Sequence, residues 1–196
     1  MYPKSFKKLI DHFSALPSIG PKMAERLVLY LFKQDENKLK DFSESLKDLK
    51  SSLRICEKCF NISEEKTCYI CRDTKRDSKM VCVVEDSLDI IAIERTKKYN
   101  GVYHVLGGLL SPTQSEEQKK KIRLAELEKT VKKDGINEVI LATNPTTEGD
   151  ATALYIKRIL DPLGVKITRL ARGMATGGDI EYADELTLGS AIDNRK

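Results

Sequence analysis

Two carboxylates in the stretch ATNPTTEGDATALYI, residues 142–156, stand on either side of a single glycine. They are Glu148 and Asp150, and a third acid, Glu85, follows the apolar run MVCVV. Carboxylate oxygens are the ligands that Mg²⁺ prefers, so the three side chains form a candidate site for metal-dependent phosphoryl transfer. The alternative is that Thr146 and the two acids cap the following helix and suit its dipole. The spacing leaves both interpretations open.

Four cysteines form a candidate metal centre of a different kind. The motifs CEKC and CYIC are two C-x-x-C pairs separated by eight residues, and their thiols belong to Cys56, Cys59, Cys68 and Cys71. Each pair can wrap two thiolates around one ion, and four thiolates in tetrahedral array suit Zn²⁺. Disulfide bonds are the alternative, but a reducing cytoplasm disfavours them. Because four thiolates leave no open coordination position, we expect the zinc to be structural.

The stretch LPSIGP separates two short helical patterns near the start of the chain. Two helices joined by such a turn form a helix-hairpin-helix candidate, in which backbone N–H groups of the turn face a DNA phosphate. Lys22 and Arg26 share one face of the second helix and would add positive charge there. Leu16 and Ile19 are expected to pack beneath the turn. The alternative is a helical hairpin that only packs. Ser18 stands where a G-x-G hairpin has its first glycine, which narrows the backbone conformations available.

From about residue 80 the pattern alternates between short apolar strands and helices. Strands are predicted at 80–85, 101–106, 137–143 and 165–171, and helices at 86–96, 116–135 and 148–160. Repeated β-α-β units favour a mainly parallel sheet flanked by helices, so the predicted fold class is α/β with small α-helical and zinc-finger modules. A further amphipathic helix is predicted from 36 to 53. Ligands of such sheets bind beyond the carboxyl ends of the strands, where Glu85, Glu148 and Asp150 are expected to converge.

The remaining residues with chemical potential have ordinary structural interpretations. No side chain near the three acids has the context of a nucleophile or general base. Cys82 is expected in the core of its strand, and neither His12 nor His104 has a neighbour that suggests catalysis. The glycine-rich stretch GMATGG could cradle phosphate but lacks the pattern of a nucleotide-binding P-loop. The last apolar residues predict a short helix that could pack against a second chain: Leu186, Leu188, Ala191 and Ile192.

The net charge of +4 is too small to establish a polyanionic partner by itself. The first 80 residues carry 17 Lys and Arg against 12 Asp and Glu, so any nucleic acid contact is expected in this part. No apolar run reaches the roughly 18 residues that span a bilayer. The start of the chain lacks the apolar segment of a signal peptide. We therefore expect a cytoplasmic protein with no membrane contact.

In combination, the motifs resemble those of the RecR family of bacterial recombination mediators along essentially the whole chain. The matching segments are LPSIGPKMAERL, CEKC, CYIC, VVED, NPTTEGDAT and LARGMATGGDIEYADELTL. The resemblance implies a helix-hairpin-helix region at 1–54 and a four-cysteine zinc finger at 55–75. It further implies a Toprim domain at 79–172 and, at 173–196, a glycine-rich segment with an oligomerisation helix.

The resemblance also implies a function without established catalysis. Members of this family act with RecO and RecF to load recombinase onto gapped single-stranded DNA, and they assemble into ring-shaped dimers of dimers. Carried over by motif position, Lys22 and Arg26 are expected to contact DNA, and Glu148 to bind RecO. The leading hypothesis is a non-enzymatic, DNA-binding, homodimeric or homotetrameric mediator with structural Zn²⁺. The alternative is a Mg²⁺-dependent Toprim nuclease or topoisomerase-like enzyme that uses Glu85, Glu148 and Asp150.

Overall fold

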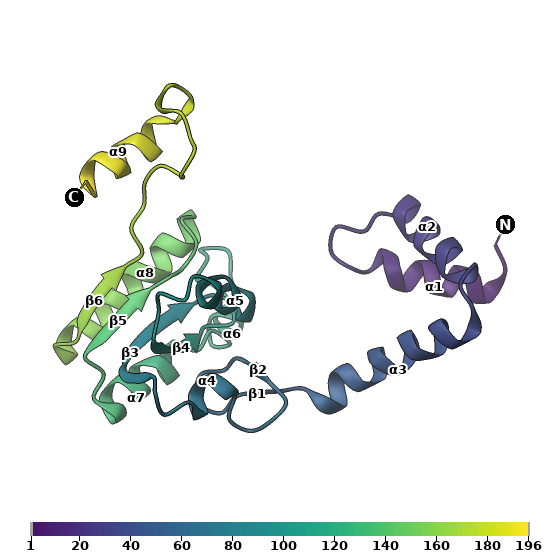
Figure 1. Ribbon diagram of the computed structural model, residues 1–196, viewed down its shortest axis with the longest axis horizontal. Helices are drawn as coiled ribbons and strands as arrows, with labels where there is room; N and C mark the ends of the chain where they lie inside the picture. Colours follow the sequence, from purple (N-terminus) through teal and green to yellow (C-terminus); the bar gives the residue numbers. More distant parts are fainter. Residues whose placement is uncertain (1, 196) are drawn as a thin grey trace. The chain divides into compact units, whose positions relative to one another are not determined.

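The computed structural model describes residues 2–195, and the chain divides into two compact units between Leu53 and Arg54 (Figure 1). Among the described residues of the first unit there are three helices: α1, Lys4–Ser14; α2, Pro21–Phe32; and α3, Glu36–Ser52. The first two pack together through the buried side chains of Ile10, Ala24 and Val28. The predicted helical hairpin is confirmed.

The turn between α1 and α2 is built by residues 15–20. Pro21 occupies the first turn of α2, where its fixed φ suits the helix and its missing N–H leaves no unpaired donor. Ile19 packs against the small helical core as expected. The expectation for Leu16 is wrong, because α1 ends before it and its side chain is 47% exposed. Its carbonyl oxygen instead accepts the N–H of Ile19, which closes the turn.

Helix α3 begins as the sequence predicts. The carboxylate of Asp35 caps it by accepting the N–H of Lys38 at 3.1 Å. None of its residues is buried, and the apolar stripe is exposed at Phe42, Leu46 and Leu49. The amphipathic helix therefore forms as predicted, but no other described part of the chain covers its apolar face.

The second unit begins with a small cysteine-rich module. Strands β1, Arg54–Ile55, and β2, Ile62–Ser63, pair in antiparallel fashion, and a single turn of helix, α4, Tyr69–Arg72, follows. Ile70 of α4 is fully buried together with three of the cysteines. The module has little apolar core of its own, so its folding depends on what the cysteines bind and on the neighbouring sheet.

The main sheet is four-stranded and entirely parallel, in the order β4-β3-β5-β6. Its strands are β3, Asp77–Val84; β4, Gly101–Val105; β5, Glu138–Leu141; and β6, Lys166–Arg169. Helix α5, Ser87–Arg95, connects the first two, and α8, Thr147–Leu160, connects the last two. The predicted α/β fold class with its parallel sheet is confirmed.

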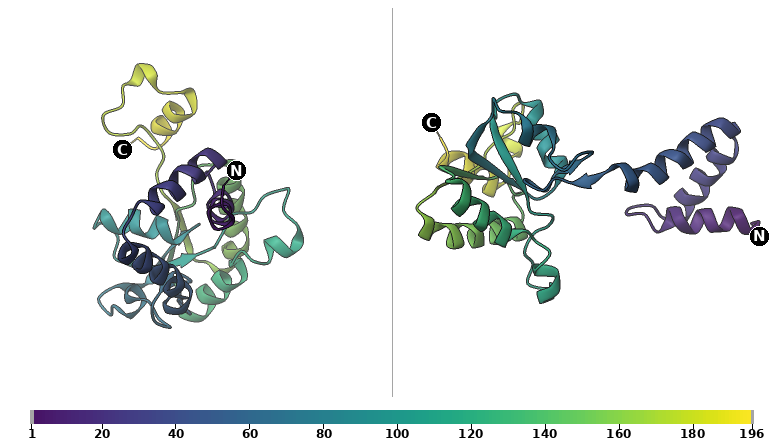
Figure 2. Two further views of the ribbon diagram at one scale, coloured as in Figure 1. Left: turned by 90° about the vertical axis from the view of Figure 1, so that its right-hand side faces the viewer. Right: turned by 90° about the horizontal axis from the view of Figure 1, so that it is seen from below.

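Alternate residues of β3 point to opposite faces of the sheet, as strand geometry requires. Val81 and Val83 belong to a core cluster with the helix residues Ile156 and Leu160. Cys82 and Val84 belong to a second cluster with Ile90 of α5 and the zinc-finger cysteines. The sheet therefore lies between helices α7 and α8 on one face and α5 with the cysteine module on the other (Figure 2). The core position predicted for Cys82 is confirmed.

The long helix predicted from 116 to 135 is two helices in the structure. Helix α6, Glu116–Lys119, is opened by a capping box between Ser115 and Gln118, and α7, Leu124–Asp134, ends at Gly135 in the left-handed conformation. Between them Ile122 is buried, and Arg123 donates its N–H to the carbonyl of Leu106 at 3.0 Å. Tertiary contacts of these two residues outweigh the helical periodicity.

The chain ends with a 3₁₀ turn, Ile180–Tyr182, and helix α9, Glu185–Asp193. Asp184 caps α9 by accepting the N–H of Thr187 at 2.9 Å. The predicted terminal helix is confirmed, and its apolar side chains Leu186 and Ile192 are largely exposed. Across residues 2–195, no helix has the length and apolar character that a bilayer crossing requires.

Candidate functional site

The four cysteines of the small module gather their sulfur atoms in one place. All four Sγ atoms lie within 4.8 Å of one another, and three of the residues are buried. A tetrahedral zinc ion with Zn–S bonds of about 2.3 Å requires sulfur atoms roughly 3.8 Å apart. The Sγ atoms of Cys59 and Cys68 are 3.5 Å apart, and all the described cysteines are free thiols. The donor set therefore fits Zn²⁺ with all four positions filled by protein.

Local backbone contacts hold this arrangement. The N–H of Cys56 donates to the carbonyl of Asn61, and the N–H of Phe60 donates to the carbonyl of Cys56, which forms a tight knuckle. Phe60 adopts a left-handed φ of 64° to complete it. The N–H of Cys68 donates to the Cys56 sulfur at 3.3 Å, a contact that stabilises a thiolate. The hydrogen bond between Cys59 and Cys68 raises the pKa of Cys59 and lowers that of Cys68. A dication at the centre would offset the charge that such closely spaced thiolates carry.

The cysteine module is joined to the sheet by an aromatic and cationic stack. The ring of Phe60 meets His104 of β4 edge to face, with centroids 5.2 Å apart, and the guanidinium of Arg123 lies 5.0 Å from the Phe60 centroid. The N–H of Val105 donates to the carbonyl of Cys59 at 2.8 Å. His104 is buried, and desolvation lowers its pKa to about 4, so its ring is neutral and structural.

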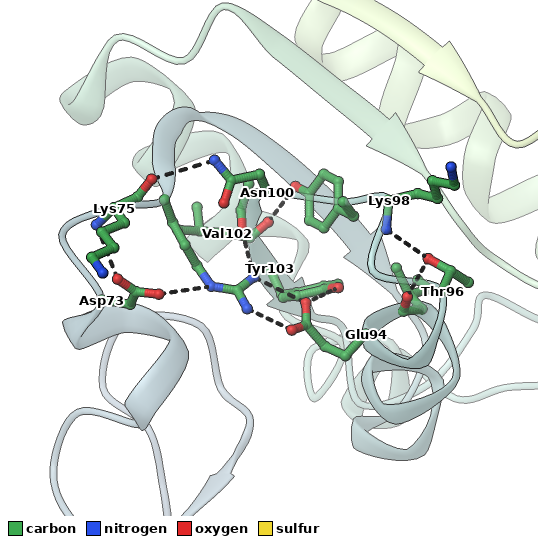
Figure 3. Close-up of polar contacts among 12 residues, drawn as sticks. Asp73, Lys75, Glu94, Thr96, Lys98, Asn100, Val102 and Tyr103 are labelled. Carbon is green, nitrogen blue, oxygen red and sulfur yellow. Dashed lines mark hydrogen bonds and ion pairs between the residues drawn. The ribbon is translucent and has the colours of Figure 1, made fainter.

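A second junction is formed by Arg76, which follows the cysteine module and precedes β3. Its partners Asp73 and Glu94 are labelled in Figure 3, with Tyr103 beside Glu94. The guanidinium of Arg76 donates to both carboxylate oxygens of Glu94, at 2.9 and 2.5 Å, and to the carbonyl of Gly101 at 3.1 Å. The hydroxyl of Tyr103 donates to Glu94 at 2.7 Å, and the carboxylate of Asp73 lies 3.7 Å from Arg76 Nε. The hydrogen bond from Arg76 lowers the pKa of Glu94. This network ties the end of the module to α5 and β4.

The acidic edge lies at the carboxyl ends of the central strands. Helices α5 and α8 leave the neighbouring strands β3 and β5 toward opposite faces, which is the arrangement that opens a ligand crevice in parallel sheets. Glu85 follows β3, and its carboxylate accepts the side-chain amide of Asn144 at 3.1 Å. The predicted place of Glu85 is thus correct, while Asn144 is a partner that periodicity does not reveal.

Asp150 turns away from Glu85 toward β6. The guanidinium of Arg169 donates to its Oδ1 at 2.5 Å, and Arg172 donates to both of its oxygens, one of them at 3.1 Å. The hydrogen bond from Arg172, with that from Arg169, lowers the pKa of Asp150 to about 2. Asp150 is therefore ionised and held by two cations.

The start of α8 also settles how the two acids relate to the helix. Thr146 is the cap, since its hydroxyl accepts the N–H of Gly149 at 3.1 Å, and both acids lie in the first turn. A Cβ on Gly149 would stand 2.0 Å from the carbonyl oxygen of Asn144, so only glycine fits between the acids. Glu148 is exposed, and its side chain has no hydrogen bond or ion pair within residues 2–195.

The three acids lie at the predicted edge of the sheet, since Glu85 follows β3 and the other two begin α8, which follows the neighbouring strand β5. Their carboxylates do not gather around one point, however: within the described part of the chain the cysteines are the one group of three or more metal-ligating side chains close enough to share an ion. One oxygen of Glu85 is engaged by an amide and both oxygens of Asp150 by guanidinium groups. Asp150 is therefore not available as a Mg²⁺ ligand in this arrangement, because both of its oxygens accept hydrogen bonds from arginine.

The basic residues of the helical hairpin lie on its surface. Lys22 and Arg26 are exposed on α2, and their side chains make no hydrogen bond or ion pair with the rest of residues 2–195. Gly20 precedes the helix without a side-chain cap, and a Cβ there would meet nothing within 4 Å. Ser18 holds a left-handed φ of 64°, the conformation that a glycine adopts more readily. The turn thus exposes helix N–H groups beside two cations, which suits a phosphate.

The glycine-rich stretch before α9 forms a turn and a close contact with the terminal helix. Gly177 has a φ of 86° within a turn in which Gly178 donates its N–H to Ala175. A Cβ on Gly173 would contact Ala191 of α9 at 3.4 Å. These glycines allow a tight turn and close packing of the terminal helix.

Sequence models of known protein domains match nearly the whole chain. Those described as the helix-hairpin-helix of RecR and as the four-cysteine zinc finger domain of RecR match residues 6–50 and 53–73. The models described as Toprim domain and RecR, C-terminal match residues 79–171 and 173–196. The chain belongs to the RecR family. The RecR zinc-finger match and the cluster of four sulfur atoms together support Zn²⁺ binding by this protein.

Several residues that organise these RecR modules escape sequence reasoning. Arg169 and Arg172 hold Asp150, and the Arg76–Glu94 pair fastens the zinc finger, yet each partner lies far away in the chain. The one signal in the sequence is that Arg169 lies within the last predicted strand, 165–171. Which charged side chains pair depends on the order of the strands in the sheet, and the periodicity of the sequence does not predict that order.

Proposed function

We propose that this RecR-family protein is a non-enzymatic mediator of recombinational DNA repair. It binds DNA and, with RecO and RecF, helps load recombinase onto gapped single-stranded DNA. The observation that carries the proposal is the succession of three RecR modules and a Toprim domain in one chain, beginning with a hairpin whose turn is open to solvent at Gly20.

DNA contact is assigned to the helical hairpin. The exposed N-terminus of α2 offers backbone N–H groups to a phosphate, and Lys22 and Arg26 add two positive charges on the same face. These contacts position the backbone of DNA without selecting a sequence, which suits a protein that acts wherever a gap occurs. Single-stranded, double-stranded and gapped forms all present the phosphate that such a site would bind.

Partner contact is assigned to the acidic edge, at Glu148. This carboxylate is exposed in the first turn of α8 and is not engaged by the described residues around it. Asp150, two residues away, already has arginine partners, so Glu148 is the acid of the pair that remains available to a RecO-like protein. One structural Zn²⁺ per chain and assembly into homodimers or homotetramers complete the proposal.

The proposal is tested by incubating the zinc-loaded protein and Mg²⁺ with supercoiled and gapped DNA. A mediator binds both substrates and leaves them intact. Cleavage or relaxation that disappears in Glu85→Ala would overturn the proposal in favour of a Toprim enzyme. Glu44→Ala, which removes an exposed acid of α3 outside the three candidate acids, is the matched control and should leave any cleavage unchanged.

A further inference from the structure

Two acids of the TEGD stretch, separated by one glycine, have opposite surroundings. Glu148 has no side-chain partner among residues 2–195, whereas Asp150 has two. Both guanidinium groups come from the chain at or just beyond the end of the sheet: Arg169 is the last residue of β6, and Arg172 lies three residues further. The carboxylate therefore binds the end of the sheet and the beginning of the C-terminal segment, residues 170–195, at once.

Arg172 in turn contacts the terminal helix. Its carbonyl oxygen accepts the side-chain amide of Asn194 at 3.2 Å, and the same amide donates to Ser190 of α9 at 2.7 Å. The next residue, Gly173, lies directly against Ala191. A continuous series of contacts thus runs from Asp150 through Arg172 to the second half of α9.

The space beside this series is a groove of about 910 Å³. Asp150 and Arg172 line one side of it, and Leu186, Thr187 and Ser190 of α9 line another. None of the residues of α9 is buried, so packing alone contributes little to its position. Charge-assisted, bidentate bonds between guanidinium and carboxylate are strong and directional, and here they supply that positional control.

We infer that Asp150 is a positioning residue that fastens the C-terminal segment to the sheet, with Arg169 and Arg172 supplying the positive charge that a divalent cation supplies in Toprim enzymes. Both carboxylate oxygens of Asp150 accept hydrogen bonds from Arg172. A divalent cation at Asp150 and the fastened C-terminal segment are mutually exclusive, because both need the same oxygens. This inference does not depend on the repair role.

Hydrogen exchange measured by mass spectrometry on the full, zinc-loaded chain tests the inference. Amides of residues 173–195 should exchange roughly five- to tenfold faster in Asp150→Asn than in the wild type, since the neutral amide loses the ionic bonds to both arginines. Glu148→Gln, a change of the same kind two positions away, should leave these rates unaltered. Millimolar Mg²⁺ should not change exchange in the wild-type protein.

Arg172→Gln tests the same contact from the arginine side and leaves every acid unchanged. The measurement is again the exchange rate of residues 173–195. This substitution should loosen residues 173–195 as Asp150→Asn does, and the double variant should be no looser than either single variant. Unchanged protection of β3 in each variant shows that the sheet is folded. Unaltered exchange of residues 173–195 in both single variants would overturn the inference. Protection of residues 144–150 by Mg²⁺ in the wild type and not in Asp150→Asn would overturn it in favour of a cation site.

Discussion

The N–H of Val105, the last residue of β4, donates to the carbonyl oxygen of Cys59, a zinc-site residue, at 2.8 Å. The zinc finger is therefore part of the sheet's edge rather than an appendage. Phe60, the next residue, adds its contact with His104 on the same strand. Loss of zinc should consequently destabilise the sheet as well as the finger.

Removal of zinc by a strong chelator should unfold residues 54–73 and also lower the thermal stability of the sheet. The finger has little apolar core of its own, so its folding depends strongly on the metal. When it unfolds, β4 loses a hydrogen bond worth about 1 kcal/mol together with the packing of Phe60. Circular dichroism melting with zinc quantification measures both effects. Cys68→Ala should lose the metal, while Cys82→Ala, a non-ligand cysteine, should keep it. Unchanged melting after complete zinc removal would contradict this prediction.

Ser18→Gly should stabilise the helical hairpin by about 0.5–1 kcal/mol, because a non-glycine residue at a φ of 64° carries backbone strain. Hydrogen exchange of α1 and α2 amides in the full chain gives the local free energy of opening. Ser43→Gly is the control: the same substitution inside helix α3 should destabilise that helix, because glycine is unfavourable in a helix interior. A loss of protection in α1 and α2 on Ser18→Gly would show that serine is favoured at this turn by a contact of its own.

The elements of this protein follow largely from its sequence, whereas several of its side-chain partnerships do not. Capping by Asp35, Asp86 and Thr146 and the termination of α7 at Gly135 follow local rules, so helix positions are predictable. The break at Ile122 and Arg123 is not, since it results from burial against the sheet.

The acidic edge shows the same division. The sequence places Glu85 just after one strand and Asp150 in the helix that follows the neighbouring strand, as the structure has them, but it does not show which partners their carboxylates take. Strand β6, at the edge of the sheet, brings Arg169 to Asp150, and the two side chains form an ion pair. Strand order and a distant cation, neither visible in local periodicity, decide the outcome. The four cysteines of the metal site, by contrast, could be predicted from the spacing of the two C-x-x-C motifs alone.

Substitution of both basic residues of the hairpin turn should weaken DNA binding and its dependence on salt. Lys22→Gln and Arg26→Gln each remove one exposed charge beside the turn, so the slope of log K against log salt should fall by about 0.9 per phosphate contact on duplex DNA. Fluorescence anisotropy at several salt concentrations measures the slope. Lys47→Gln, an exposed lysine of α3, is the matched control and should leave it unchanged. If all three variants had the same slope, DNA would bind at a surface other than the helical hairpin.

Glu94→Gln should destabilise the sheet by about 2–3 kcal/mol at neutral pH, since it leaves the mostly buried Arg76 guanidinium without its charged partner. The pKa of Glu94 is lowered in the folded state. Its contribution is therefore present above the unfolded pKa of about 4.3 and is lost as the pH falls through the lower folded value. Urea unfolding at neutral and acidic pH should show that the difference in unfolding free energy between wild type and variant becomes smaller in acid.

The control is Glu128→Gln, which removes an acid from an exposed ion pair with Lys132 and should lower the unfolding free energy by no more than about 0.5 kcal/mol. A difference that grows in acid would contradict the assigned ion pair.

Recombinase loading onto gapped DNA coated with single-strand-binding protein tests the mediator role most directly. With RecO-like and RecF-like partners present, the zinc-loaded protein should accelerate recombinase filament formation at the gap and leave the DNA uncut. Glu148→Ala should lose this acceleration while retaining its affinity for DNA. Failure of the wild-type protein to accelerate loading in the presence of active partners would contradict the proposed function.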